Sequence, residues 1–345
     1  MIRKIFLSLI VIIIGIALFY GYKLYQKIYA PSVETPQQSD YYFYIHTGDT
    51  FEDVINNLFQ QHLIDNKEIF KWIAEKKNYP NNVHPGRYLL KNKMSNNELI
   101  NLLRSGNQTP VKVTFHNVRT KEQLAGKITK NLEADSARFL TLLNDESFVK
   151  HYGFNTNTIL TMFLPNTYEM YWNTNEEALF EKMAKEYKKF WTEERKQKPK
   201  NIGLSQSEVS ILASIVEAEQ RTIRAERPKI AGLYINRLKK GMLLQSDPTV
   251  IYAMGDFTIN RVLTKHLTID SPYNTYKYKG LPPGPILLPS INSIDAVLNY
   301  EHHNYIYMCA KEDFSGYHAF ATNLREHAVN ARKFQQALNK RRIYK

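Results

Sequence analysis

The chain is poor in cysteine. Cys309 is the one cysteine among 345 residues, so a disulfide within the chain and a cysteine-rich zinc site are excluded. The basic residues form no run of five or more, and no helix-turn-helix or zinc-finger pattern occurs. His302, His303 and His318 are too scattered to suggest a metal site, so neither a metal nor a cofactor is expected.

The composition describes a folded, basic protein. Hydrophobic residues make up 43% and aromatic residues 12%, which is enough for hydrophobic cores in two modest domains and excludes a disordered chain. The formal net charge of +13 favours an anionic partner. Nucleic acid, lipid headgroups and cell-wall carboxylates all fit this charge, but the dispersed basic residues argue against nucleic acid.

An uncharged segment near the start of the chain predicts a membrane anchor. It runs from Ile5 to Tyr22, close to the length of about 20 residues that a helix needs to cross a bilayer. Residues 1–4 are then a cytoplasmic stub. The bulky Ile28 before Tyr29 and Ala30 is unfavourable for cleavage of a signal peptide. Residues 23–40, rich in Pro, Gln and Ser towards their end, are expected to form a flexible linker.

The next segment, residues 41–106, predicts a small module of strand, helix, helix and strand. Strand patterns cover residues 42–46 and 87–90, and apolar residues at helical spacing cover residues 50–61 and 66–77. Ser95 and Glu98 form a capping-box pattern for a further helix that ends near Gly106. Periodicity alone therefore indicates a small α+β unit.

Residues 107–345 are expected to form a second, mixed α/β domain. The patterns predict a strand over residues 111–115, a helix opened by Thr120 and Gln123, helices over 136–143 and 176–191, and an aromatic turn over 163–168. A helix over residues 228–239 should serve as scaffold.

Glu217 is the first candidate for catalysis. It lies next to the apolar stripe of a helix that the capping pair Ser205 and Glu208 opens. Ser210, Ala213 and Ser214 precede it on the same face and, being small, would leave open space beside its carboxyl group. A carboxyl group partly buried against apolar groups stays protonated more readily, as a general acid requires.

The competing interpretation of Glu217 is an ordinary ion pair with Arg221, four residues further on. Position alone does not choose between the two interpretations. Glu219 lies two residues from Glu217 and points to another face of the helix, so these two carboxyl groups should not act as a catalytic couple.

Proline-stiffened loops follow, with residues suited to sugar recognition. A polar loop runs from Gln245 to Thr249, a second loop from Ser271 to Tyr276, and a third from Gly280 to Pro285. Flat aromatic rings pack on pyranose faces and amides bind hydroxyl groups, so the loops together favour a binding groove. For any one of these residues, a purely structural role is the simpler interpretation.

Five ordered motifs resemble the endolytic murein transglycosylase (YceG-like) family. They are ASIVE (213–217), YINRL (234–238), QSDPTVIY (245–252), YNTY (273–276) and GLPPGP (280–285). The opening of the 41–106 module is similar to a LysM-like domain, so the resemblance covers nearly the whole chain. One departure is Asn166, where relatives usually have an aspartate.

The resemblance implies a membrane-anchored lyase that cuts peptidoglycan. It assigns Glu217 as catalytic acid and base: the residue protonates the oxygen between MurNAc and GlcNAc and then takes the proton of the MurNAc 6-hydroxyl, which gives a 1,6-anhydro end. The residues expected to bind substrate are Gln245, Ser246, Asp247, Thr249, Tyr273, Asn274 and Tyr276.

The implied partners are peptidoglycan strands, the cell membrane and peptidoglycan synthases, with the catalytic body on the outer side of the membrane. Positive charges on the two sides of the anchor are balanced, so orientation rests on the resemblance. Two alternatives stay open: a peptidoglycan hydrolase that uses Glu217 and Asp247, and a non-catalytic wall-binding scaffold.

Overall fold

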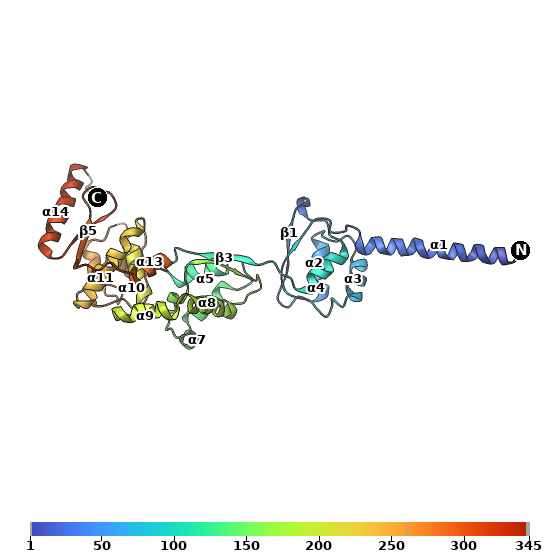
Figure 1. Cartoon of the computed structure of the whole chain (residues 1–345), viewed down its shortest axis with the longest axis horizontal. Helices are drawn as coiled ribbons and strands as arrows, with labels where there is room; N and C mark the ends of the chain where they lie inside the picture. Colours follow the sequence, from blue (N-terminus) through green and yellow to red (C-terminus); the bar gives the residue numbers. More distant parts are fainter. Residues whose placement is uncertain (1, 260, 343–345) are drawn as a thin grey trace. The chain divides into compact units, whose positions relative to one another are not determined.

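The computed structural model describes residues 2–259 and 261–342 of the chain. The protein is a mixed α+β protein with two compact units. The first unit comprises residues 1–113, 131–134 and 169–175, and the second comprises residues 114–130, 135–168 and 176–345. Figure 1 shows the elements of both units.

The first helix, α1 (Ile2–Tyr29), is long and apolar enough to cross a membrane. An 18-residue window within Arg3–Tyr29 has a mean hydropathy of 2.5, and the side chains from Arg3 to Lys27 are exposed. The helix continues past Tyr22, where the uncharged run ends. At its end, Ile28 packs against the core of the first unit, and the Asn96 side-chain amide donates a 3.1 Å hydrogen bond to the carbonyl of Lys27.

Part of the segment expected to be a flexible linker is packed in the structure. Val33 is buried, its N–H donates to the carbonyl of Met94 (2.9 Å), and its carbonyl accepts from the N–H of Lys93 (2.8 Å). The N–H of Thr35 donates to Oδ1 of Asn92 (3.2 Å). Apolar burial of Val33 and these hydrogen bonds hold residues 31–35 against the first unit.

The predicted order of strand, helix, helix and strand is confirmed in the first unit. Its elements are β1 (Tyr41–Ile45), α2 (Phe51–Gln60), α3 (Lys67–Lys76), β2 (Gly86–Leu90) and α4 (Asn96–Ser105). β1 and β2 pair antiparallel, with Phe43 opposite Tyr88. Capping boxes at Thr50 and Ser95 begin α2 and α4, and Gly106 in the left-handed region ends α4. Alternate strand residues and the apolar helix faces enclose one core.

Two later segments return to the first unit, so its boundary is more complex than a single cut near residue 106. Glu133 accepts hydrogen bonds from the backbone N–H (2.8 Å) and the hydroxyl (2.6 Å) of Thr47. Trp172 packs edge-to-face on Tyr44, with ring centroids 4.9 Å apart. Boundaries taken from chain order cannot detect segments that return.

The second unit begins with short helices around an aromatic cluster. The elements in this part of the chain are β3 (Val111–Phe115), α5 (Lys121–Thr129), α6 (Ser136–Asn144), α7 (Glu146–His151), a 3₁₀ turn (Ile159–Met162), β4 (Asn166–Met170), α8 (Glu176–Phe190) and α9 (Glu193–Ile202). β3 pairs with β4, so the expected aromatic turn over 163–168 runs into a strand. Phe139 and Phe163 pack with Phe180 of α8 in the interior.

The later part of the second unit is built around one buried helix. Its elements are α10 (Gln206–Glu219), a 3₁₀ turn (Arg224–Glu226), α11 (Arg227–Lys239), α12 (Asp247–Met254), a 3₁₀ turn (Thr264–Thr268), α13 (Ile291–Leu298), β5 (Tyr307–Ala310), β6 (His318–Ala321) and α14 (Leu324–Lys340). α10 packs against α11, α12 and α13, and Figure 1 shows α10, α11 and α13 grouped together. β5 and β6 pair antiparallel, and α14 lies against them.

Candidate active site

Two glutamates in the last turn of α10 face different parts of the second unit. The capping box of Ser205 and Glu208 begins this helix, and the residues from Val209 to Val216 are all buried, so the helix is fixed on every side. Glu217 and Glu219 follow the buried segment. Residues two positions apart on a helix are separated by about 200° around its axis. The side chains of Glu217 and Glu219 accordingly line separate cavities.

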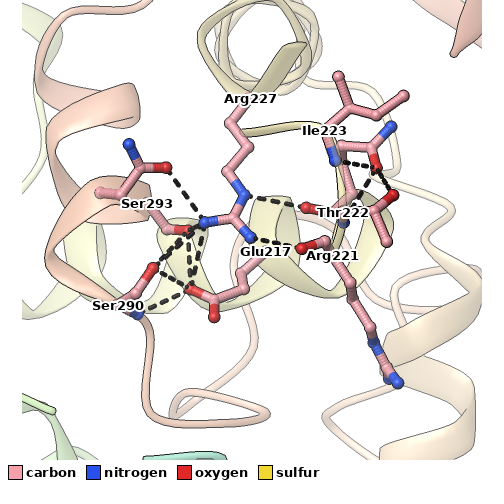
Figure 2. A network of polar contacts seen from close by, with 9 residues as sticks. Glu217, Arg221, Thr222, Ile223, Arg227, Ser290 and Ser293 are labelled. Carbon is pink, nitrogen blue, oxygen red and sulfur yellow. Dashed lines mark hydrogen bonds and ion pairs between the residues drawn. The ribbon is translucent and has the colours of Figure 1, made fainter. Parts of the chain in front are cut away.

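The carboxyl group of Glu217 is held by the start of α13. Its Oε2 accepts hydrogen bonds of 2.7 Å from the backbone N–H of Ser290, the hydroxyl of Ser290 and the hydroxyl of Ser293. Nη1 of Arg227 lies 3.8 Å from the same oxygen (Figure 2). The side chain is 18% exposed. These contacts are typical of a carboxylate that joins two helices, because three donors converge on one oxygen.

The ion pair of Glu217 with Arg221, the competing interpretation of the sequence, is absent from the described part of the chain, and Arg227 takes the place of Arg221. Figure 2 shows the Arg221 side chain extending away from the carboxyl group. Arg227 is 3% exposed and also donates to the carbonyls of Gln220 (2.9 Å) and Arg221 (3.2 Å). Through these hydrogen bonds, the buried guanidinium group of Arg227 holds the loop that follows α10 against α13.

Open space lies beside the Glu217 carboxyl group, as the sequence predicts, but the small residues before Glu217 do not line it. Ser210, Ala213 and Ser214 are all buried. The hydroxyl of Ser214 donates to the carbonyl of Ile211 (2.6 Å) and accepts from the N–H of Ile286 (3.1 Å). Small side chains on this face let the loop before α13 pack closely on α10, because a larger side chain would hold the two apart.

The cavity beside Glu217 is large and basic. It has a volume of about 660 Å³. Besides Glu217, its charged wall residues are all arginines. The wall consists of His116, Asn117, Arg119, Pro165, Glu217, Arg221, Arg224, Arg227, Leu287, Leu288 and Ser290.

Glu219 is half-buried, as Glu217 is, but it has different partners. Its Oε1 accepts hydrogen bonds from the phenol of Tyr234 on α11 (2.7 Å) and from the hydroxyl of Ser246 (2.6 Å). Burial raises the pKa of Glu219 above the usual range of a glutamate, and the nearby Asp247 acts in the same direction. The two hydroxyl donors oppose this rise, because they stabilise the carboxylate.

The cavity beside Glu219 brings together several of the predicted groove residues. It has a volume of about 270 Å³ and is lined by Glu219, Leu233, Tyr234, Arg237, Leu244, Gln245, Asp247, Tyr276, Met308, Cys309, Ala310 and His318. The phenol of Tyr276 donates a 2.6 Å hydrogen bond to Oδ1 of Asp247. Arg237 donates to the side-chain oxygen of Gln245 (3.2 Å) and to the carbonyl of Leu244 (2.8 Å). A raised-pKa acid, a carboxylate, an amide and a phenol therefore share one small cavity.

Three predicted binding residues are used inside the protein. Ser246, Thr249 and Asn274 are fully buried. The side-chain amide of Asn274 donates to the carbonyls of Leu267 (2.9 Å) and Ile269 (2.8 Å), and the Thr249 hydroxyl bonds to the carbonyl of Ser246 (2.7 Å). Their polar atoms shape the loops around Glu219, so contact with a ligand does not explain their position.

The segment from Gln245 to Thr249 is not a loop throughout, which corrects the sequence expectation. Ser246 is the N-cap of α12, and Asp247 and Pro248 are its first residues. Proline at this position suits a helix start, because its missing N–H would have no partner in the helix. Tyr273 lies elsewhere, in a third cavity with Tyr252 and Phe257.

Sequence reasoning missed the partners of both glutamates. In the sequence, Tyr234 stands out only as part of the scaffold helix over 228–239 and its YINRL motif, and Ser290, Ser293 and Arg227 do not stand out. The Ser290 and Ser293 pair at a helix start carried a local signal, but nothing in the sequence connects it to residue 217. Among the residues that the structure describes, no group of three or more His, Cys, Asp or Glu side chains is placed to hold a metal ion.

Comparison with known proteins places this arrangement in a family. A model of the YceG-like family matches residues 43–333. The chain belongs to the YceG-like family. An endolytic murein transglycosylase of Bacillus subtilis (strain 168) is 30% identical to this YceG-like chain over 346 residues, which cover 96% of the chain and 93% of the relative.

Relatives from other organisms agree with this assignment. Endolytic murein transglycosylases of the Streptococcus pneumoniae strains D39 and R6 are 28% and 29% identical over 82% of the YceG-like chain, which spans 56% of their length. The crystal structure of a YceG-like protein from Listeria monocytogenes has a TM-score of 0.56 at 28% identity and covers 85% of this chain and 99% of that one.

Proposed function

We propose that this protein is a membrane-anchored endolytic murein transglycosylase in which Glu219 is the catalytic acid and base. The names of its relatives support the reaction. One observation supports the residue: Glu219 is half-buried, desolvation of its carboxyl group raises its pKa, and it lines a cavity with Gln245, Asp247 and Tyr276. Burial keeps such an acid protonated until a substrate oxygen can accept its proton.

One carboxyl group suffices for the proposed reaction. Protonated Glu219 donates its proton to the oxygen between MurNAc and GlcNAc as the bond from that oxygen to C1 of MurNAc breaks. The carboxylate then takes the proton of the MurNAc 6-hydroxyl while the 6-oxygen bonds to C1, which leaves a 1,6-anhydro ring. Because the nucleophile belongs to the substrate, the attack is intramolecular and needs no water.

The neighbours of Glu219 have complementary roles in this proposal. Tyr234 and Ser246 bind Oε1, so the proton of the neutral acid is carried by Oε2. Asp247 provides negative charge near the positive charge that develops at C1, and the 2.6 Å hydrogen bond from Tyr276 orients it. Gln245 offers an amide to sugar hydroxyls at the wall of the cavity.

Glu217, to which the family resemblance assigns catalysis, remains the second candidate. Glu217 also lines a cavity. Ser290 and Ser293 donate to its Oε2, so they do not occupy its other oxygen, Oε1. Its contacts favour a different role, because three donors and Arg227 already hold the carboxylate in place. We therefore assign Glu217 as a positioning residue that joins α10 to α13.

A two-carboxylate hydrolase is the rival reaction. The hydrolase considered from the sequence pairs Glu217 with Asp247, but these residues line separate cavities. Glu219 and Asp247 line the same cavity, as the acid and the second carboxylate of a glycosidase would have to do. The two reactions differ in their products, since hydrolysis leaves a reducing sugar and transglycosylation leaves an anhydro sugar.

The first unit is proposed to hold the glycan and to keep the enzyme at the membrane. Its strand, helix, helix and strand order is compatible with a LysM-like glycan-binding module. The apolar α1 supports anchoring, with the rest of the chain on the outer side where peptidoglycan lies. Tethering would restrict cleavage to newly made strands near the bilayer and would place the enzyme beside peptidoglycan synthases.

The test is to incubate the full-length protein in detergent with purified sacculi and to identify the released sugar ends by mass spectrometry. The expected product is a fragment ending in 1,6-anhydro-MurNAc. Reducing ends would replace the proposal with the hydrolase. Binding to sacculi without any release of fragments would replace it with a wall-binding scaffold.

A further inference from the structure

The cavity beside Glu217 has a composition that the proposed reaction does not require. We call it the arginine cavity, because Arg119, Arg221, Arg224 and Arg227 all line it. Among the described residues of its wall, Glu217 is the one acidic residue. Four guanidinium groups against one carboxylate give this space a strong positive potential, and like charges gathered in one place cost stability unless a ligand uses them.

Of the four arginines, Arg227 alone has a carboxylate partner among the residues that the structure describes. Arg227 is buried between Glu217 and the start of α13. Among residues 2–259 and 261–342, no carboxylate lies within 4.0 Å of a side-chain nitrogen of Arg119, Arg221 or Arg224. Burial and the charge of Arg221 both lower the pKa of Arg119, which reflects the crowding of like charges.

Part of this cavity is preorganised. The guanidinium carbon of Arg119 lies 4.5 Å from the ring centroid of Phe257, and the backbone N–H of Arg119 donates to the side chain of Gln123 (2.9 Å). Arg221 and Arg224 are exposed on the short connection between α10 and α11. A planar guanidinium stacked on an aromatic ring loses less freedom on binding an anion.

We propose that the arginine cavity binds carboxylate groups of the peptide side chains that murein strands carry. This inference rests on the proposed function, because it concerns the same substrate. Arginine binds carboxylates through paired hydrogen bonds, and several arginines suit a peptide with more than one carboxylate. An enzyme that cuts within strands meets peptides all along them. A pyrophosphate occurs only at a lipid-linked end, so carboxylates match an endolytic enzyme better.

Direct binding measurements test this inference on the full-length protein in detergent. The probes are a soluble GlcNAc-MurNAc disaccharide that carries a tetrapeptide, the same disaccharide without peptide, and inorganic pyrophosphate. We expect the peptide-bearing probe to bind at least about tenfold more tightly than either of the others, because ion-assisted hydrogen bonds contribute on this scale. Equal affinity for the two disaccharides, or tighter binding of pyrophosphate, would overturn the inference.

Matched variants assign the effect to the cavity. Replacing Arg221 and Arg224 together by Gln should weaken binding of the peptide-bearing probe about tenfold or more, and Lys at both positions should restore part of the loss. The control replaces Arg325 and Arg332 by Gln, which removes the same charge from exposed positions on α14. An equal loss in the control would overturn the inference, since only general charge would then matter.

Cleavage kinetics separate this inference from the proposed function. On peptide-bearing strands, the Arg221 and Arg224 double variant should raise KM with kcat largely retained. The Glu219→Gln variant should bind the peptide-bearing probe like the wild type and cut strands about 10²–10⁴-fold more slowly. A wild-type protein that cuts no strand but still prefers the peptide-bearing probe would contradict the function alone. Cleavage with no preference for peptide would contradict the cavity assignment alone.

Discussion

The phenol of Tyr234 donates a 2.7 Å hydrogen bond to the carboxyl group of Glu219, across the contact between α11 and α10. The hydroxyl of Ser246 reaches the same oxygen from the start of α12. Three helices therefore fix one acid at the wall of a small cavity. A hydrogen-bonded carboxyl group in buried surroundings is a preorganised proton donor, because little rearrangement is needed at the moment of transfer.

The two glutamates should respond differently to removal of their charge. We expect Glu219→Gln to lower the rate of anhydro-product formation by about 10²–10⁴-fold, the usual contribution of general acid catalysis. Glu217→Gln should stay within about tenfold of the wild type, because Gln can still accept hydrogen bonds from Ser290 and Ser293. The measurement is product release from sacculi by chromatography and mass spectrometry. The opposite ranking of the two variants would return the catalytic role to Glu217.

The pH dependence should report on the hydrogen bond from Tyr234. This bond lowers the pKa of Glu219, while burial raises it by more. Tyr234→Phe removes the lowering contribution, so the pKa of Glu219 should rise further. The proton donor must be protonated at the start of the reaction. The fall of kcat/KM with rising pH should therefore be shifted to higher pH in the variant, relative to the wild type. Tyr171→Phe, at an exposed position of the first unit, is the control. An unchanged or downward-shifted decline would show that Glu219 does not supply the proton.

Most of the helix boundaries could be predicted from the sequence because their signals are local. Ser95 with Glu98 and Ser205 with Glu208 form capping boxes in the structure as their spacing indicates, and Gly106 ends α4. Each signal involves residues within one helical turn. α12 was missed because the polar residues from Gln245 to Thr249 match a loop as well as a helix start.

The candidate site could be predicted only in part, because long-range contacts decide it. The sequence identified the last turn of α10, but neighbours far along the chain distinguish Glu217 from Glu219. Ser290 lies 73 residues from Glu217, and Ser246 lies 27 residues from Glu219. Helical periodicity predicts that the two side chains lie on different faces of the helix, but it does not predict which residues pack against each face.

Catalytic placement of Glu219 should cost stability at neutral pH. Its pKa is raised in the folded protein, so the folded state binds a proton more tightly than the unfolded state. Stability therefore falls as pH rises from the unfolded pKa of about 4.3 through the folded pKa. Glu219→Gln should raise the unfolding temperature at pH 7–8, by about 2–4 °C per kcal/mol gained. At pH values below the unfolded pKa, the two proteins should unfold at similar temperatures. A variant that is less stable than the wild type at pH 8 would contradict this account.

Glu217 should be a stabilising residue, in contrast to Glu219. Glu217→Ala leaves the buried Arg227 without its carboxylate and removes the acceptor of three hydrogen bonds from Ser290 and Ser293. The expected loss is about 1–3 kcal/mol in the free energy of unfolding, and Glu217→Gln should lose less because one acceptor oxygen stays. Thermal unfolding of the full-length protein in detergent measures the difference.

Glu301→Ala is the matched control for this loss. Glu301 also lies 3.8 Å from a cation, Lys229, but its side chain is 52% exposed, against 18% for Glu217. Solvent screens an exposed pair of this kind, so its removal should cost no more than about 1 kcal/mol. If the Glu217→Ala and Glu301→Ala variants unfold alike, Glu217 does not hold α10 to α13, and its carboxyl group would again be available for chemistry in the arginine cavity.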